Sequence, residues 1–280
     1  MIDVHTHCHL AEHWGCEWHN NWQPVYGYDY PGTTPAEYDE AMADGGVELA
    51  FVFGMRASRA GVITPNKYVE WFCANTQTKT VGFMALDPSD DDVLDQLADG
   101  VARGLGGIKL YPILAHFDPR DVAHDPFYEA ATDAGLVVLW HMGATPSPEG
   151  KLEVSNPLVV DEVARRHPDL TQIIAHLGHP WQRETIVTLR KNRNVFSDVS
   201  ASWARPMDGY LALARAQEWD VVQKLLFASD YPLWTPAAAI SGLRELGATK
   251  MSGWPAIKPE TIEWLLEGDP LPALRLSAAG

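Results

Sequence analysis

Short apolar runs recur along the chain, each rich in aliphatic or β-branched residues. They cover residues 2–4, 49–53, 81–85, 107–110, 136–140, 172–175, 195–199 and 225–228. Such runs, with little polar alternation, are typical of parallel strands that are covered on both faces. The room between successive runs suffices for a helix, so the pattern predicts eight β-then-α units. These units could form an open doubly wound sheet or a closed barrel, and the count of eight favours a (β/α)₈ TIM barrel as a single α/β domain over residues 1–280.

Helix boundary signals fall between these runs. Helices are expected to begin at four capping signals, Thr34-Pro35, Thr64-Pro65, Ser89 and Asn156-Pro157. They are expected to end at three glycines, Gly46, Gly135 and Gly247.

Two segments lie outside the repeat. Residues 8–31 contain three Trp, three Tyr and three His without a clear period, which predicts a long loop after the first strand. The tail after Trp254 contains PETIEWLLEGD, which predicts an extra C-terminal amphipathic helix packed outside the barrel.

Composition narrows the class of protein. Asp and Glu outnumber Lys and Arg by 37 to 21, and the net charge of -16 disfavours a nucleic-acid partner. No apolar run is long enough to span a bilayer and the N-terminus lacks a signal peptide, so we expect a soluble, cytoplasmic protein that does not bind membranes. The three cysteines have no paired spacing and are expected to be reduced. A small-molecule substrate is the expected partner, and a homo-oligomer is left open.

Polar residues stand where the predicted strands end, which is where barrel enzymes carry their active sites. The first, fourth, fifth, sixth and eighth runs lead into His5-Thr6-His7, Lys109, His141, His176 and Asp230. His5 and His7 are two apart on a strand, so both imidazoles project from one face toward a common ion.

Each of these residues has a simpler interpretation. An isolated His-x-His pair is more often structural, His141 could be a core histidine bonded to a backbone carbonyl, and Asp230 could cap a turn. Their coincidence at the same end of several strands favours metal ligands.

Five motifs, in this order, carry a family resemblance: MIDVHTH, GIKLYP, VVLWHMG, IIAHLGHPW and FASDYP. The chain resembles the amidohydrolase superfamily, specifically its amidohydrolase-related (amidohydrolase 2) branch, over nearly its whole length. The resemblance implies a distorted barrel with one divalent ion held by His5, His7, His141 and Asp230. It also implies His176 as the residue that acts on water or substrate, and Asp230 is a second candidate for accepting the proton. Three imidazoles and one carboxylate suit Zn²⁺, with Mn²⁺ or another divalent ion as alternatives.

Further residues are candidates for substrate binding. Lys109 at the pocket mouth would bind a substrate carboxylate, whereas in two-metal members of the superfamily a carbamylated lysine bridges two ions. Arg56 would pair with a carboxylate, although a solvated loop arginine is an equal alternative. Trp203 and Trp234 are expected to line a pocket for a flat substrate, together with three tryptophans of the first loop, Trp14, Trp18 and Trp22.

The resemblance to the amidohydrolase-related branch implies two possible functions, and a third requires no catalysis. The first is a metal-dependent hydrolase that cleaves an ester, lactone or amide bond with metal-activated water. The second is a metal-dependent non-oxidative decarboxylase, a carbon-carbon lyase, of an aromatic or unsaturated carboxylic acid. The third is a non-catalytic metal-binding barrel. Family decarboxylases tend to be longer than 280 residues, which favours hydrolysis.

Overall fold

Eight parallel strands form a closed sheet at the centre of the computed structural model, which describes residues 1–27, 29 and 32–276. In pairing order they are β1 (Ile2–His7), β2 (Leu49–Phe53), β5 (Lys79–Ala85), β6 (Gly107–Leu110), β7 (Val137–Trp140), β8 (Thr171–Ile174), β9 (Val195–Asp198) and β10 (Leu225–Leu226). The last strand meets the first through Val4 N–H to the Phe227 carbonyl (3.1 Å) and Asp230 N–H to the His5 carbonyl (2.9 Å). The predicted TIM barrel is therefore confirmed.

The strands are mostly apolar because both of their faces are buried. On β2, Phe51 and Phe53 point into the barrel, and the alternate residues Ala50 and Val52 pack outward against the helices. All four are fully buried. This two-sided burial explains the continuous apolar runs in the sequence.

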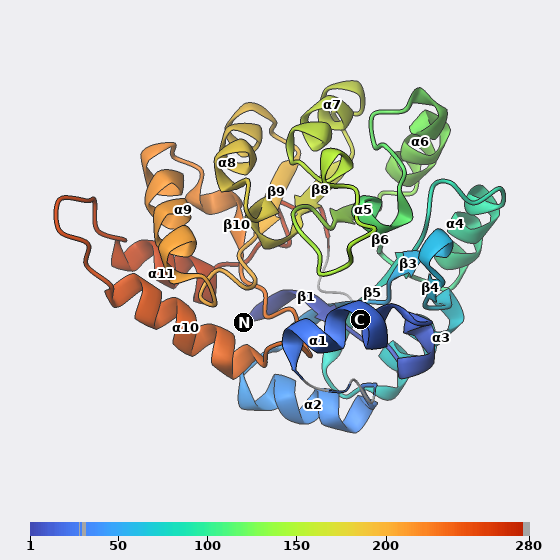
Figure 1. Cartoon of the computed structure of the whole chain (residues 1–280), viewed down its shortest axis with the longest axis horizontal. Coiled ribbons are helices and arrows are strands. Elements are labelled where there is room, and N and C mark those ends of the chain that lie inside the picture. Colours follow the sequence, from blue (N-terminus) through green and yellow to red (C-terminus); the bar gives the residue numbers. More distant parts are fainter. Residues whose placement is uncertain (28, 30–31, 277–280) are drawn as a thin grey trace.

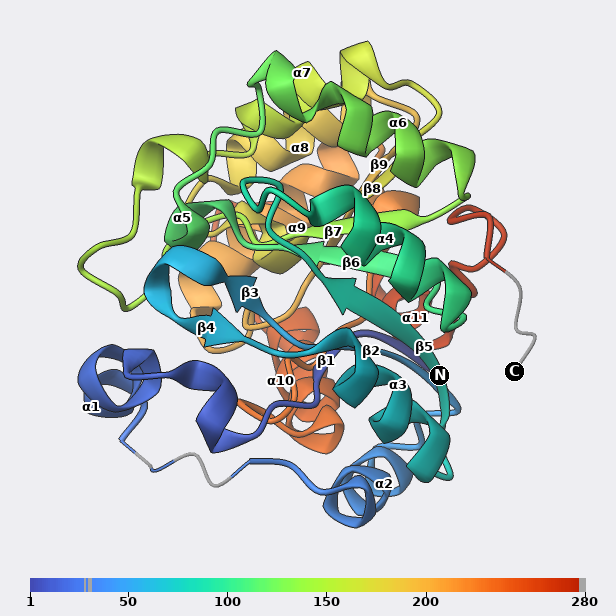
Figure 2. The ribbon, with the colours of Figure 1, turned by 90° about the vertical axis from the view of Figure 1, so that its right-hand side faces the viewer.

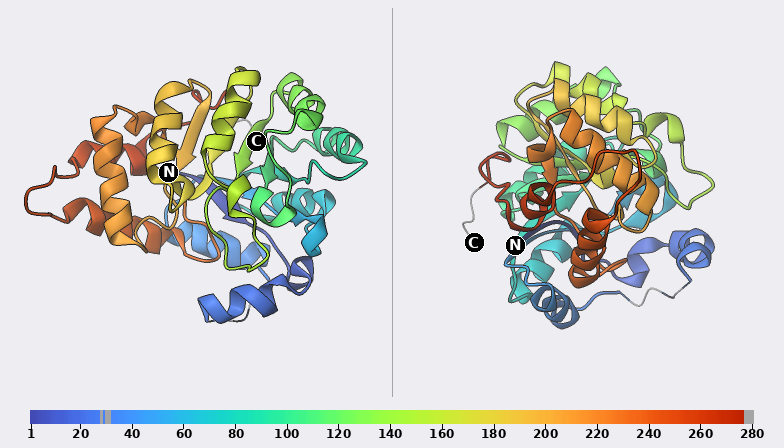
Figure 3. Two further views of the ribbon diagram at one scale, coloured as in Figure 1. Left: turned by 45° about the horizontal axis from the view of Figure 1, so that its top comes forward. Right: turned by 90° about the vertical axis from the view of Figure 1, so that its left-hand side faces the viewer.

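A ring of helices surrounds the sheet (Figure 1). Its members are α2 (Pro35–Asp44), α3 (Asn66–Asn75), α4 (Val93–Ala102), α6 (Asp125–Asp133), α7 (Leu158–Arg166), α8 (Gln182–Lys191), α9 (Pro206–Glu218) and α10 (Pro236–Ala248). The predicted extra helix is α11 (Pro259–Glu267), which contacts α10 (Figures 1 and 3). Within the described residues, no helix combines the length and apolarity needed to cross a membrane.

Two of the four predicted cap residues accept a hydrogen bond from a backbone N–H at the start of a helix. Thr34 caps α2, accepting from the Glu37 backbone N–H at 3.3 Å. The Asn156 side chain accepts from the Leu158 N–H at 3.0 Å, where α7 begins.

At the other two signals the predicted residues do not cap a helix, although α3 does begin directly after Thr64-Pro65. Thr64 instead accepts from the Met55 N–H across a hairpin, and α3 begins at Asn66 without a side-chain cap. The Ser89 N–H donates to Asp87 in a turn, which delays α4 to Val93.

Two of the three predicted stop glycines end helices. Gly46 and Gly135 follow α2 and α6 with φ of 66° and 67°, which glycine adopts without strain. Gly247 lies inside α10, so that prediction was wrong. A Cβ there would lie 2.6 Å from Ile262 Cγ1, and glycine is needed for the close approach of α10 and α11.

The segment after β1 is not the irregular loop that we predicted. It forms a 3₁₀ turn (Ala11–Trp14), a π-helical turn (Trp18–Trp22) and the short helix α1 (Gln23–Tyr26). Figure 2 shows α1 set apart from the outer ring of helices. Residues 28, 30 and 31 of the predicted loop lie outside the described residues.

Candidate metal centre

Three ligand atoms meet where β1 ends and the chain leaves β10. His5 Nε2 lies 3.2 Å from His7 Nε2 and 3.2 Å from Asp230 Oδ1, and His7 Nε2 lies 3.3 Å from the same oxygen. For metal bonds of about 2.1 Å, such spacings correspond to ligand-metal-ligand angles of about 100°. All three side chains are at most 9% exposed. The donor set therefore fits a single divalent ion.

The charges at this site also suit a metal. Burial, reinforced by Lys109, lowers the pKa of His5 well below its usual value, and burial together with His9 does the same for His7. Both imidazoles are therefore neutral, as metal ligands must be. Burial raises the pKa of Asp230 well above that of an ordinary carboxyl group. A bound cation would favour its ionised form.

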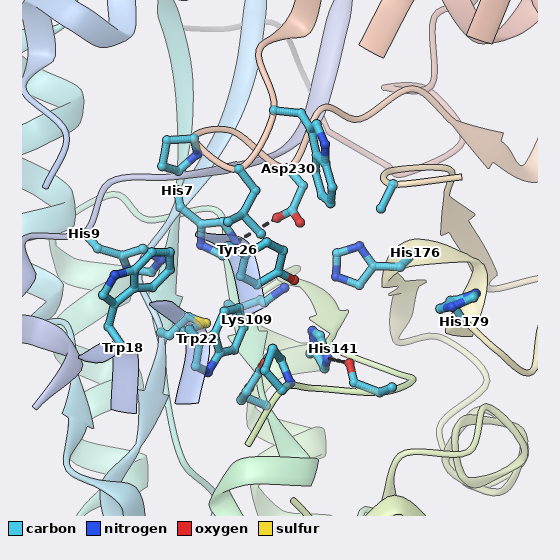
Figure 4. A pocket seen from close by; sticks show the side chains of 18 of the residues that line it. His7, His9, Trp18, Trp22, Tyr26, Lys109, His141, His176, His179 and Asp230 are labelled. Atoms are coloured by element: carbon cyan, nitrogen blue, oxygen red, sulfur yellow. Dashed lines mark hydrogen bonds and ion pairs between the residues drawn. The ribbon is translucent and has the colours of Figure 1, made fainter. Parts of the chain in front are cut away.

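His176 faces the same space from the turn after β8. One ligand atom each of His5, His176 and Asp230 lies within 4.8 Å of the others. Figure 4 shows the side chains of His7, His176 and Asp230 turned toward a common space. The backbone of His176 is left-handed (φ 57°). A non-glycine residue in that conformation costs roughly 1–3 kcal/mol and persists only where its surroundings enforce it.

His141, the predicted fourth ligand, lies at the pocket but is engaged differently. Its ring packs against Tyr111 at 4.1 Å, and its Nε2 lies 3.2 Å from the Ala144 carbonyl. This is the carbonyl-bonded arrangement that the sequence left as an alternative. Burial, then Lys109, lowers its pKa well below the usual value, so the ring is neutral.

Lys109 lies on the floor of the site and not at its mouth, where the sequence had placed it. The side chain is fully buried, and its Nζ lies 3.3 Å from His5 Nε2 and 4.7 Å from the centre of the Phe53 ring. Burial lowers its pKa from 10.5 to about 7. A hydrogen bond from Nζ would use the His5 lone pair that a metal needs, so an ion at His5 requires Lys109 to give up this contact.

An aromatic wall borders the pocket above these residues, a space of about 760 Å³ that is open to solvent. The wall comes from the segment after β1 and the loop after β10, and consists of Trp14, Trp18, Trp22, Tyr26 and Trp234. Trp22 stacks on both Trp18 and Tyr26, at 6.1 and 5.8 Å between ring centres.

Trp203 does not line this pocket, in contrast to the prediction. It packs edge-on against Trp234 at 6.1 Å and against Gly242 of α10, where a Cβ would meet its ring at 2.5 Å. Trp203 therefore supports Trp234 from behind.

The arginine that lines the pocket is not the one that the sequence suggested for substrate binding. Arg56 lies in a short hairpin after β2 and pairs with Asp90 at 2.6 Å, outside the pocket. Arg205, which the sequence analysis missed, lines the pocket from the loop between β9 and α9 and is exposed. Among the described residues it has no ion-pair partner. Its signal in the sequence was its place after the seventh strand, in a loop at the catalytic end of the barrel.

Asp198 and Ser200, at the end of β9, were missed as well. Asp198 Oδ2 lies 2.8 Å from His5 Nδ1, and its Oδ1 accepts the His176 backbone N–H at 2.9 Å. Ser200 Oγ lies 2.7 Å from His176 Nδ1. The seventh strand also ends in polar residues, Ser197 and Asp198, which was the available signal.

Comparison with known proteins identifies similar sequences and folds. A family model described as Amidohydrolase matches residues 2–276. No curated protein matches the sequence significantly.

Three solved structures illustrate the proteins that share this fold. A probable 2-pyrone-4,6-dicarboxylic acid hydrolase from Acinetobacter baumannii, with citric acid bound, is 14% identical with a TM-score of 0.71, covering 98% of this chain and 99% of that one. An amidohydrolase from Burkholderia multivorans with bound zinc is 15% identical with a TM-score of 0.70, covering 99% of both chains. A dihydroxybenzoic acid decarboxylase from a Polaromonas species, with manganese and the inhibitor 2-nitroresorcinol, is 14% identical with a TM-score of 0.68, covering 98% and 96%. At these identities the likeness shows a shared fold.

Proposed function

Because the chain belongs to the amidohydrolase family, we propose that it is a metal-dependent hydrolase that cleaves an ester, lactone or amide bond of a small cyclic or carboxylate-bearing molecule. The observation that carries this proposal is the cluster of His5, His7 and Asp230, whose ligand atoms lie 3.2 to 3.3 Å apart beside His176. Such a cluster at the catalytic end of a barrel combines a metal site with a base in one pocket.

In this proposal His5, His7 and Asp230 hold one divalent ion, and His141 completes the set by exchanging its contact with Ala144 for the metal. Zn²⁺ and Mn²⁺ are the leading candidates, since they are bound by two of the similar proteins. When bound, such an ion activates water and polarises a carbonyl group. A second ion bridged by carbamylated Lys109 is the less favoured arrangement.

His176 is the proposed proton acceptor. Burial, together with His5, lowers its pKa well below the usual value, so the imidazole is neutral and can accept a proton. Its Nδ1 is occupied by Ser200 Oγ, which leaves Nε2 for the pocket. Asp230 is the second candidate for this role.

The pocket supports a flat, anionic substrate. Trp18, Trp22 and Trp234 offer ring faces or edges to a planar molecule. Arg205, exposed and without an ion-pair partner in the described part of the chain, provides a cation that can pair with a carboxylate in bidentate fashion.

The test is a direct assay on metal-replete protein. A panel of lactones and aromatic carboxylic acids is incubated with the enzyme, and acid release is measured in parallel with CO₂ release. Metal-dependent acid release from a lactone, ester or amide supports hydrolysis. CO₂ release without ring opening or bond hydrolysis would refute it in favour of the lyase.

Decarboxylation remains the second candidate because length does not separate the two classes. The chain covers 99% of a 2,6-dihydroxybenzoate decarboxylase of the same fold and 96% of the manganese-bound one, so the argument from length does not hold. Arg205 would anchor the carboxylate equally well in that reaction.

A further inference from the structure

One carboxylate, that of Asp198, contacts both His5 and His176 at the centre of the site. It is fully buried at the end of β9. Its Oδ2 faces His5 Nδ1 at 2.8 Å. Its Oδ1 accepts from the backbone N–H groups of His176 and Ser200, at 2.9 and 3.1 Å, and from Ser200 Oγ at 2.5 Å. Each oxygen of Asp198 thus faces at least one hydrogen-bond donor, which is the arrangement that suits an ionised carboxylate.

The direction of these hydrogen bonds follows from the number of protons. An ionised carboxylate only accepts, so the single proton of Ser200 Oγ points to Asp198. The hydroxyl oxygen must then accept from His176 Nδ1, 2.7 Å away, which places the proton of that ring on Nδ1. For the same reason His5 Nδ1 donates to Asp198 Oδ2.

We propose that Asp198 and Ser200 are positioning residues that hold His5 and His176 in the same Nδ1–H tautomer, so that both Nε2 lone pairs face the pocket. Asp198 thereby aligns a metal ligand and the proton acceptor together, whereas Ser200 acts on His176 alone. The inference rests on the proposed function for the roles of the two histidines.

The contrast with His7 supports a specific role. Among the described residues, His7 Nδ1 is buried and has no hydrogen-bond partner, so its ring is oriented by packing against Phe53 and His9. Partners of this kind on ligand histidines fix the tautomer, and their loss typically lowers metal affinity 10- to 100-fold. Asp198 therefore makes His5 the better fixed of the two first-strand ligands.

Two substitutions separate the roles. In Asp198→Asn, the amide oxygen can serve the His176 and Ser200 donors only if its NH₂ group turns toward His5 Nδ1. His5 must then carry its proton on Nε2, where it blocks the metal. In Ser200→Ala, His5 keeps its partner and His176 loses the acceptor for Nδ1–H. Ser200→Thr, which retains a hydroxyl group, is the matched control.

The experiment combines histidine NMR with zinc titration. Long-range ¹H–¹⁵N spectra of ¹⁵N-histidine-labelled protein, assigned with His5→Asn and His176→Asn, report the tautomers, and Zn²⁺ affinity is measured against a competing chelator. We expect Nδ1–H at both rings in the wild type. Ser200→Ala should change the tautomer of His176 only and leave the Zn²⁺ affinity within about twofold of the wild-type value. Its effect on kcat should be a decrease that is larger than any change in KM. Ser200→Thr should keep the wild-type tautomer of His176. Asp198→Asn should lower the affinity for Zn²⁺ at least tenfold.

An Nε2–H tautomer of either ring in the wild type would overturn the proposal, as would an unchanged His176 tautomer in Ser200→Ala. Since neither the spectra nor the zinc titration requires a substrate, they test this inference separately from the proposed hydrolysis. The expected tautomers in a protein that hydrolyses no member of the panel would leave the positioning roles standing and reject the proposed function.

Discussion

Replacing the buried Lys109 by Met should abolish a specific pH dependence of stability in the metal-free protein. The pKa of Lys109 is lowered by burial from 10.5 to about 7, so the unfolded chain binds a proton that the folded protein lacks between these values. The free energy of unfolding therefore rises with pH across this range, and the stability is lost as pH falls toward 7. Between the two pKa values the free energy of unfolding should rise by about 5 kcal/mol in total. About 2 kcal/mol of this rise falls between pH 7 and pH 9.

The assay is urea unfolding of chelator-treated protein at pH 7 and pH 9. Lys109→Met keeps an unbranched side chain but removes the contact with His5 Nε2, which costs roughly 1–3 kcal/mol. We expect the variant to lose about 2 kcal/mol of the pH-dependent rise relative to the wild type. The exposed Lys250, replaced by Met, is the matched control and should leave the rise unchanged. An equal rise in Lys109→Met and the wild type would refute the assignment of this titration to Lys109.

Three further substitutions test the proposed proton acceptor, the cation of the pocket and a close backbone approach. His176→Asn should lower kcat at least 100-fold and retain metal by elemental analysis; loss of the ion would show that His176 is a ligand. Arg205→Met should raise KM for carboxylate substrates about tenfold without a similar change for neutral esters, measured by steady-state kinetics. Gly143→Ala should lower the free energy of unfolding by several kcal/mol in denaturant titrations. The reason is that Gly143 has a φ of 106° and that a Cβ there would lie 2.1 Å from the His179 carbonyl oxygen. A change below about 0.5 kcal/mol would contradict that steric argument.

The barrel was predictable because its strands are buried on both faces and read as apolar runs. The centre of the site was predictable for a related reason. His5, His7, His176 and Asp230 interrupt or follow those runs, and the carboxyl ends of parallel strands converge at one end of a barrel. Strand position alone therefore brought most of the candidate residues together.

The sequence could not show how deep a side chain lies in the pocket or in which direction it points. Lys109 follows the same rule of strand ends, but only the packing of Phe53 and His5 shows that its Nζ lies on the floor of the pocket. Arg56 and Arg205 both follow strands, and the choice between them depends on Asp90, 34 residues from Arg56 in sequence, which pairs with it.

The segment after β1 contained a signal that we did not use. Trp14, Trp18, Trp22 and Tyr26 recur at every fourth position, the spacing of one helical face. We predicted a loop because residues 8–31 as a whole show no clear period. The stacked wall that these residues form is the consequence of that spacing.

Metal content shows whether His5, His7 and Asp230 hold one divalent ion. Protein produced with added zinc and manganese is freed of loosely bound ions and measured by elemental analysis beside Asp230→Asn, which removes one ligand charge from the cluster. We predict about one divalent ion per wild-type chain and less than about a tenth as much in the variant. A wild-type protein without metal, or a variant that retains the full amount, would contradict the assignment of His5, His7 and Asp230 as the metal centre, and two ions per chain would contradict the single-ion site.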